Sequence, residues 1–198
     1  MNRIAIDVND VLRDTFLKLE ETYTKFVLND EELMSGDFEY GLNLPVTTID
    51  LINHFKFKNN EELFEFMFLE HPMIIFGHAP SKETHTFNYI NEFYKEHRKD
   101  SKITIISQEV EKSKPATLFF ISKFGCLVEN YRFYSNFTLL DVINENDFIV
   151  TTNREILLNH KEKAIKFETE YNKDIECEHT IKSISELNKL FIKIKNYG

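Results

Sequence analysis

A short β-branched run near the N-terminus, Arg3 to Val8, constrains this chain most, because it ends in two turn-forming residues, Asn9 and Asp10. The run has no helical period, which is typical of a buried strand followed by a tight turn. Similar runs recur further along the chain, at Lys102 to Ser107, Asn130 to Phe133, Phe148 to Val150 and Ala164 to Phe167. Segments with apolar residues at helical spacing separate these runs. Strands that alternate with helices predict an α/β fold, a parallel sheet with helices on both faces.

Residues 14–78 interrupt this alternation with a region that reads as mostly helical. Apolar residues recur at close to 3.6-residue spacing from Arg13 to Leu28, and Asn60 before two glutamates is typical of a helix start. We expect a loop over Ser35 to Pro45 and a short helix capped by Thr47 or Thr48. The run Met73 to Phe76 is the single candidate strand of this region.

At the other end of the chain, Ser183 to Glu186 has the pattern of a capping box, in which the Ser and Glu side chains each bond the other's backbone amide. The apolar residues behind it, Leu187, Leu190, Phe191 and Ile194, recur at helical spacing. We therefore expect the last helix to begin at this box.

Composition excludes several classes of protein. The formal charge of -9, from 33 acidic and 24 basic side chains, argues against a general nucleic-acid-binding surface. No apolar run approaches the roughly 18 residues of a membrane-spanning helix, and Met1 to Asp10 lacks a signal-peptide pattern, so we expect a cytoplasmic or virion protein with no membrane partner. Cys126 and Cys177 are too few for a disulfide framework. Abundant Phe, Ile, Asn and Lys are typical of AT-rich coding and indicate a bacterial or viral source.

Polar residues follow the ends of three predicted strands. The strands end at Asp7, at Ser107 and at Thr151, and Asn9 and Thr152 lie directly behind two of these ends. Ligands of open α/β sheets bind beyond the carboxyl ends of the strands, so these residues are the candidate site.

These motifs and their order resemble the haloacid dehalogenase (HAD) superfamily of phosphotransferases. Ile4 to Leu12 matches its first motif, a hydrophobic strand ending in Asp-x-Asp-x-(Thr or Val)-Leu, except that Asn9 stands at the second Asp. Ile103 to Ser107 matches the second motif, a strand ending in Ser or Thr. Lys114 is the best match to the third motif, a Lys at a helix start, with Lys112 as the alternative.

The resemblance implies a Rossmann-like three-layer core formed by residues 1–13 and 79–198, with a small helical cap inserted at residues 14–78. This placement is most similar to that of the 5'(3')-deoxyribonucleotidases. In such enzymes the residue at Asp7 attacks phosphorus and forms an aspartyl-phosphate, and an Asp at position 9 acts as acid and base. Ser107 and Lys114 would bind the phosphoryl oxygens. Mg²⁺ would be held by Asp7, a backbone carbonyl and acidic residues of a fourth motif.

Two departures from the family pattern argue against catalysis. Asn9 cannot exchange a proton as a carboxyl does, and losing a general acid–base group costs on the order of 10² to 10⁴ in rate. Thr151 and Thr152 stand where the fourth motif has its acidic ligands, which leaves a metal with Asp7 and little else. Without metal, we expect Asp7 to pair with the amine of Lys114, an attraction of about 4 kcal/mol at 4 Å and an effective dielectric near 20, before desolvation.

Three functional hypotheses follow. In the first, a HAD-fold protein has lost phosphatase activity, keeps Asp7 as a vestigial nucleophile, needs no cofactor, and binds protein partners as a structural component of a phage virion or other assembly. In the second, it is an active Mg²⁺-dependent 5'(3')-deoxyribonucleotidase with Asp7 as nucleophile. In the third, its pocket binds a nucleotide or phosphate without hydrolysis.

Overall fold

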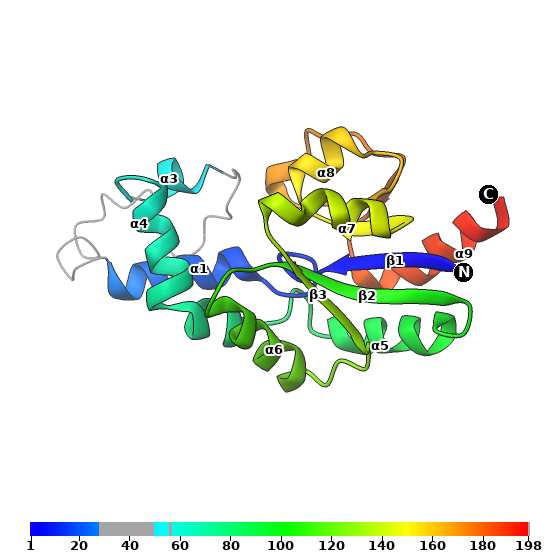
Figure 1. Cartoon of the computed structure of the whole chain (residues 1–198), viewed down its shortest axis with the longest axis horizontal. Coiled ribbons are helices and arrows are strands. Elements are labelled where there is room, and N and C mark those ends of the chain that lie inside the picture. The colour runs from blue at the N-terminus through cyan, green and yellow to red at the C-terminus, as the bar shows by residue number, and fades with distance from the viewer. Residues whose placement is uncertain (28–49, 56, 198) are drawn as a thin grey trace.

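The computed structural model describes residues 1–27, 50–55 and 57–197, and its core is a parallel sheet. The six strands are β1 (Asn2–Asp7), β2 (Ser101–Gln108), β3 (Asn130–Tyr134), β4 (Phe148–Thr151), β5 (Ala164–Phe167) and β6 (His179–Ile181). Their order across the sheet is β3-β2-β1-β4-β5-β6, and every neighbouring pair is parallel. The predicted α/β fold with a parallel sheet is therefore confirmed, and β6 is an additional strand (Figure 1).

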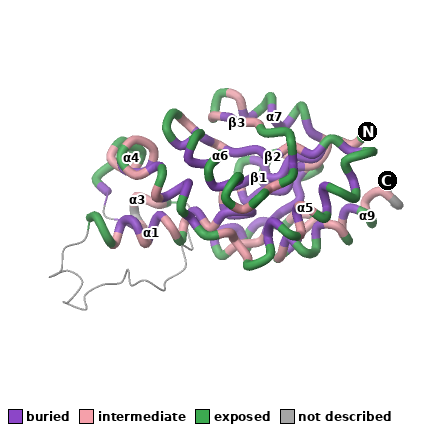
Figure 2. Tube along the Cα trace, turned by 90° about the horizontal axis from the view of Figure 1, so that it is seen from below, coloured by how far each residue is buried: buried purple, intermediate pink, exposed green. Residues whose placement is uncertain are grey.

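The strand β1 lies in the centre of the sheet because its apolar run is uninterrupted and can be buried on both faces. It pairs with β2 on one side and β4 on the other, and Ile4, Ala5 and Ile6 are fully buried. Alternate side chains enter opposite layers, because Ile4 and Ile6 belong to one apolar cluster and Ala5 to the other. Figure 2 shows β1 and β2 as buried segments in the middle of the molecule.

Helices cover both faces of the sheet. The helices α5 (Thr86–His97), α6 (Ser113–Lys123) and α9 (Leu187–Tyr197) pack on the face that Ile4 and Ile6 enter. On the opposite face lie α7 (Leu139–Glu145) and α8 (Arg154–Asn159). This gives three layers, which Figure 1 shows with α7 and α8 above the sheet and α5 and α6 below it.

The described residues between Thr15 and Gly77 form a lobe at one end of the molecule, here called the cap lobe. Its helices are α1 (Thr15–Phe26), α3 (Leu51–His54) and α4 (Asn60–Phe64), followed by π-helical segments at Glu65–Glu70 and Met73–Gly77. They share an apolar cluster that includes Leu19, Tyr23, Phe55, Phe66 and Phe76. The loop expected over Ser35 to Pro45 and the cap expected at Thr47 or Thr48 lie outside the described residues.

Two local predictions are wrong. Met73 to Phe76 is not a strand, because the π-helical turns place Ile75 and Phe76 together in the cap cluster, where a strand would point them to opposite sides. Ser183 to Glu186 is not a reciprocal capping box. Instead the Ser183 hydroxyl accepts from the Ser185 amide at 3.2 Å, and the Glu186 carboxylate accepts from the Lys182 amide at 3.4 Å.

None of the helices among the described residues is long and apolar enough to cross a membrane.

Candidate functional site

The turn after β1 begins the site. The Arg13 amide donates to the Val8 carbonyl at 2.9 Å, which folds the chain back on itself immediately beyond the strand. Asp10 has a φ of 57°, in the left-handed region that Asp tolerates better than most residues. Its carboxylate accepts from the Thr15 amide at 3.1 Å and from the Phe16 amide at 3.3 Å, two donors in the first turn of α1. The turn thus joins the sheet to the cap lobe and directs the Arg13 side chain back under the strand ends.

Asp7 ends β1 as a buried carboxyl, 3% exposed, held mainly by hydroxyl groups. Its Oδ2 accepts from Thr151 Oγ1 at 3.0 Å and from the Tyr134 hydroxyl at 3.3 Å. Burial raises the pKa of Asp7 to about 7, although these hydroxyls and the nearby amides of Val8 and Asn9 favour the ionised form. The other oxygen, Oδ1, has no hydrogen-bond partner among the described residues.

Arg13 is the cation beside this group, and it is fully buried. Its guanidinium donates to Glu109 Oε1 at 2.8 Å, to Thr117 Oγ1 at 2.6 Å, to Asn9 Oδ1 at 2.5 Å and to the Phe76 carbonyl at 3.0 Å. Burial lowers the pKa of Arg13, while the Glu109 carboxylate opposes that shift. The guanidinium is therefore held by groups of the protein itself, with Glu109 as its counter-ion.

Asn9 and Ser107 meet in the same network, as the ends of adjacent parallel strands should. Asn9 Nδ2 donates to Ser107 Oγ at 3.3 Å, and Asn9 Oδ1 accepts from Arg13 and from Thr15 Oγ1 at 3.0 Å. Ser107 is 2% exposed and donates its own hydroxyl proton to Glu109 Oε1 at 2.8 Å. The Ser107 hydroxyl, which was predicted to bind phosphate, is thus already bonded to a carboxylate of the protein.

Lys114 lies apart from this cluster. It is the second residue of α6, its side chain is exposed, and its ammonium group makes no hydrogen bond or ion pair with another described residue. The predicted pair between Asp7 and Lys114 is not formed, because the buried face of α6 presents Ala116 and Thr117 instead. Lys112, the alternative, reaches the cap lobe at the Leu69 carbonyl, at 3.5 Å.

The ends of β1 and β4 do not suit Mg²⁺. Thr151 donates to Asp7, and Thr152 Oγ1 donates to the Asn9 carbonyl at 3.4 Å, so both hydroxyls are engaged inside the protein. Mg²⁺ prefers carboxylate oxygens in octahedral geometry. Within the described part of the chain, no group of three or more His, Cys, Asp or Glu residues could hold a metal ion. The donor set present therefore does not fit the magnesium that the family resemblance implies.

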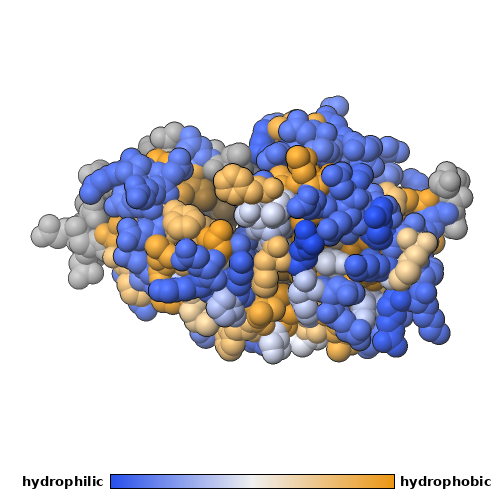
Figure 3. All heavy atoms as spheres, viewed as in Figure 1, coloured by the Kyte–Doolittle hydropathy of each residue, from blue (hydrophilic) through white to orange (hydrophobic). Residues whose placement is uncertain are grey.

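A cleft of about 730 Å³ opens in front of Asp7, between the strand ends and the cap lobe. Figure 3 shows this face hollowed between the two parts, with apolar side chains around the hollow. Its polar floor contains Asp7, Asp10, Tyr134, Thr152 and Asn153. Its apolar wall contains Phe16, Leu63, Phe64, Met67, Phe68 and Phe76. Lys114 and Ser107 are not among the residues that line it.

Three residues of the site carry no clear signal in the sequence. Arg13 directly follows an apolar pair, Val11 and Leu12, and this neighbourhood is the one hint in the sequence that it is buried. Glu109 and Tyr134 stand just beyond the ends of their apolar runs, where charged and aromatic residues are common. Their roles depend on the pairing of β2 with β3, which places Tyr134 beside Gln108.

Comparison with known proteins identifies the fold. No family model matches the chain, and no curated protein matches it in sequence. Among solved structures, it is similar to a haloacid dehalogenase-like hydrolase from Burkholderia xenovorans, with 12% sequence identity, a TM-score of 0.57 and 96% of each chain covered. The chain therefore has the haloacid dehalogenase-like fold, a Rossmann-like α/β architecture.

Proposed function

We propose that this chain, which has the haloacid dehalogenase-like fold, has lost phosphoryl-transfer chemistry and works by binding. The observation that carries the proposal is the Arg13–Glu109 pair. Both side chains are completely buried, and Glu109 of this pair also accepts a hydrogen bond from the Ser107 hydroxyl. The hydroxyl that should donate to a phosphoryl oxygen, that of Ser107, is thereby bonded to a carboxylate of the protein.

Electrostatics at the cleft support the same conclusion. Among the described residues that line it, Arg154 is the single cation, and its guanidinium bonds both oxygens of Asp174 at 2.7 and 2.8 Å. The acids Asp7, Asp10 and Glu155 line the same space. A phosphate dianion would meet carboxylates without a free cation or a divalent metal, and like charges at such distances repel.

A binding role also fits the apolar groups at the cleft mouth. Phe137, on the core side, is 98% exposed, and Phe64, on the cap side, is 40% exposed. Aromatic side chains left in solvent are typical of surfaces that contact a partner. An interaction role in a larger assembly, a phage particle included, is part of this proposal.

A phosphatase assay tests the proposal directly. Purified chain would be incubated with millimolar Mg²⁺ and either p-nitrophenyl phosphate or deoxynucleoside monophosphates, and phosphate release would be measured. We expect release at the background rate, with no difference between the wild type and Asp7→Asn.

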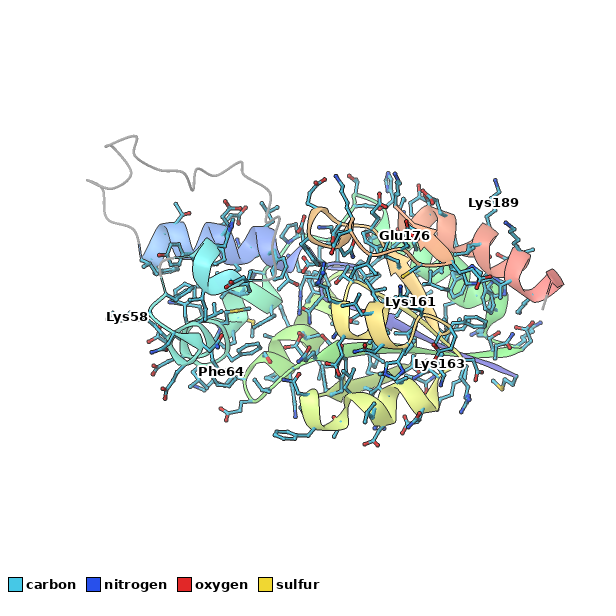
Figure 4. All side chains as sticks on the ribbon, turned by 90° about the horizontal axis from the view of Figure 1, so that it is seen from above. Lys58, Phe64, Lys161, Lys163, Glu176 and Lys189 are labelled. Carbon is cyan, nitrogen blue, oxygen red and sulfur yellow. The ribbon has the colours of Figure 1, made fainter. Side chains whose placement is uncertain are left out.

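The alternative is an active 5'(3')-deoxyribonucleotidase with Asp7 as nucleophile. Turnover of about 1 s⁻¹ or more, within the usual range for enzymes, that is abolished by Asp7→Asn would establish it and refute the loss of chemistry. The exposed variant Glu176→Gln controls for a general effect of substitution and purification, because it should copy the wild type (Figure 4).

A further inference from the structure

We propose that the cleft binds an organic cation, a protonated primary amine with an apolar body, whose ammonium group pairs with the Asp7 carboxylate at the cleft floor. The inference rests on the proposed function, because a phosphatase would need the opposite charge in this space. It names the chemical class of ligand that the described residues select.

The unpartnered oxygen of Asp7 is the first observation. Asp7 lines the cleft, is only 3% exposed, and has its Oδ2 occupied by Thr151 and Tyr134 while Oδ1 has no partner. A buried acceptor without a donor is destabilising, and native proteins rarely leave one unless a ligand or water completes it. An ammonium group supplies three donors and a compensating charge, which makes it a stronger partner for a carboxylate than a neutral hydroxyl.

The balance of charge is the second observation. Asp7, Asp10 and Glu155 line the cleft, while Arg154 is bound to Asp174. Behind the floor, Arg13 and Glu109 neutralise one another at 2.8 Å. The described lining is therefore net acidic, which favours cations and disfavours carboxylates and phosphates.

The apolar wall of the cleft indicates the chemistry of the rest of the ligand. Its cap side presents Phe16, Leu63, Phe64, Met67, Phe68 and Phe76. Such a wall removes apolar surface from water, and aromatic faces attract cations within reach. At about 730 Å³ the space suits a small molecule of ordinary size. A bare divalent ion does not suit it, since the described residues offer no cluster of acids that could hold a metal.

Isothermal titration calorimetry with a matched series of probes tests the inference. 2-Phenylethylammonium and octylammonium are the cationic probes, and 2-phenylethanol, phenylacetate and phenyl phosphate share the aromatic body of the first. We expect both ammonium probes to bind, 2-phenylethylammonium about tenfold or more tighter than 2-phenylethanol, because hydrogen bonds to charged groups are the stronger ones. Phenylacetate and phenyl phosphate should give no heat of binding.

Variants separate the two parts of the site. Asp7→Asn should reduce ammonium affinity about tenfold or more and leave 2-phenylethanol unaffected, with circular dichroism confirming that the variant is folded. Phe64→Ala, a change at a half-exposed residue that Figure 4 labels, should weaken the ammonium and alcohol probes by the same factor. Glu176→Gln should bind as the wild type does.

Three results would overturn the inference: no binding of either ammonium probe, equal affinity for 2-phenylethanol, or ammonium binding that survives Asp7→Asn. Failure of the proposed function would look different, because phenyl phosphate would then bind and release phosphate with Mg²⁺. If no probe gives a heat of binding and no phosphate is released, the inference about the ligand is refuted. The proposed loss of phosphatase chemistry is then unaffected.

Discussion

Replacing Asp7 by Asn should stabilise the folded chain at alkaline pH. Burial raises the pKa of this carboxyl from an ordinary value of 3.8 to about 7. Between these values the folded chain keeps a proton that the unfolded chain has released. The free energy of unfolding therefore falls as pH rises from about 4 to about 7 and is lower by a constant amount above that range.

The size of the effect follows from the shift. One pKa unit corresponds to about 1.4 kcal/mol, so a shift of about three units makes ionised Asp7 cost about 4 kcal/mol at pH 8. In the variant, the amide oxygen can accept from Thr151 and Tyr134 as Oδ2 does now, so these two bonds are kept without a buried charge. We expect Asp7→Asn to exceed the wild type by up to about 4 kcal/mol at pH 8, and by less than half of that at pH 5.

Urea unfolding at several pH values between 5 and 8 measures this difference. Burial raises the pKa of Asp10 to about 6. This residue is present in both proteins, so subtracting the stability of the variant from that of the wild type removes its contribution. Glu176→Gln, at an exposed position, should stay within about 0.5 kcal/mol of the wild type throughout. Parallel curves for wild type and Asp7→Asn, or a variant that is less stable at pH 8, would refute the reasoning.

Three further changes test other parts of the site and fold. Arg13→Met leaves Glu109 buried and unpaired, which should cost about 3 to 5 kcal/mol in urea unfolding, and a cost below 1 kcal/mol would contradict the buried pair. The double variant Asn9→Asp, Thr151→Asp introduces the two carboxylates of the haloacid dehalogenase pattern, so millimolar Mg²⁺ should raise its thermal midpoint and leave the wild type unchanged; equal shifts would refute the misfit. Gly125→Ala should cost about 1 to 2 kcal/mol by thermal unfolding, because φ is +64° and no atom lies near the added methyl group, which leaves backbone strain alone.

The central strands were predictable because they are buried on both faces. Such strands are read as apolar runs, which are unbroken in β1 and β4 and interrupted only by Thr104 in β2. The strand β6 was missed because only Ile181 of its three residues is strongly apolar and buried. Met73 to Phe76 failed for the reverse reason, since a four-residue apolar run fits a strand or a buried helical turn equally well.

The site was predictable only as far as strand ends determine it. Asp7 ends β1, and Ser107 is the second-last residue of the neighbouring parallel strand β2, so their sequence motifs sufficed to place them at one edge of the sheet. Which cation reaches that edge depends on the direction of a turn and the rotation of a helix. The turn after β1 buries Arg13, and the rotation of α6 exposes Lys114. Neither angle can be read from the spacing of residues.

The identity of residue 9 follows from this network. Arg13 already has a counter-ion in Glu109, so a carboxylate at position 9 would add a second acid to a fully buried cation that needs one. An amide meets the local demand better, because its oxygen accepts from Arg13 and Thr15 while its nitrogen donates to Ser107. A carboxylate has no proton to donate to that hydroxyl. The internal pairing of Arg13 and the amide at position 9 are therefore two parts of one arrangement, and a carboxylate at position 9 would require a change at Glu109 or a metal to offset its charge.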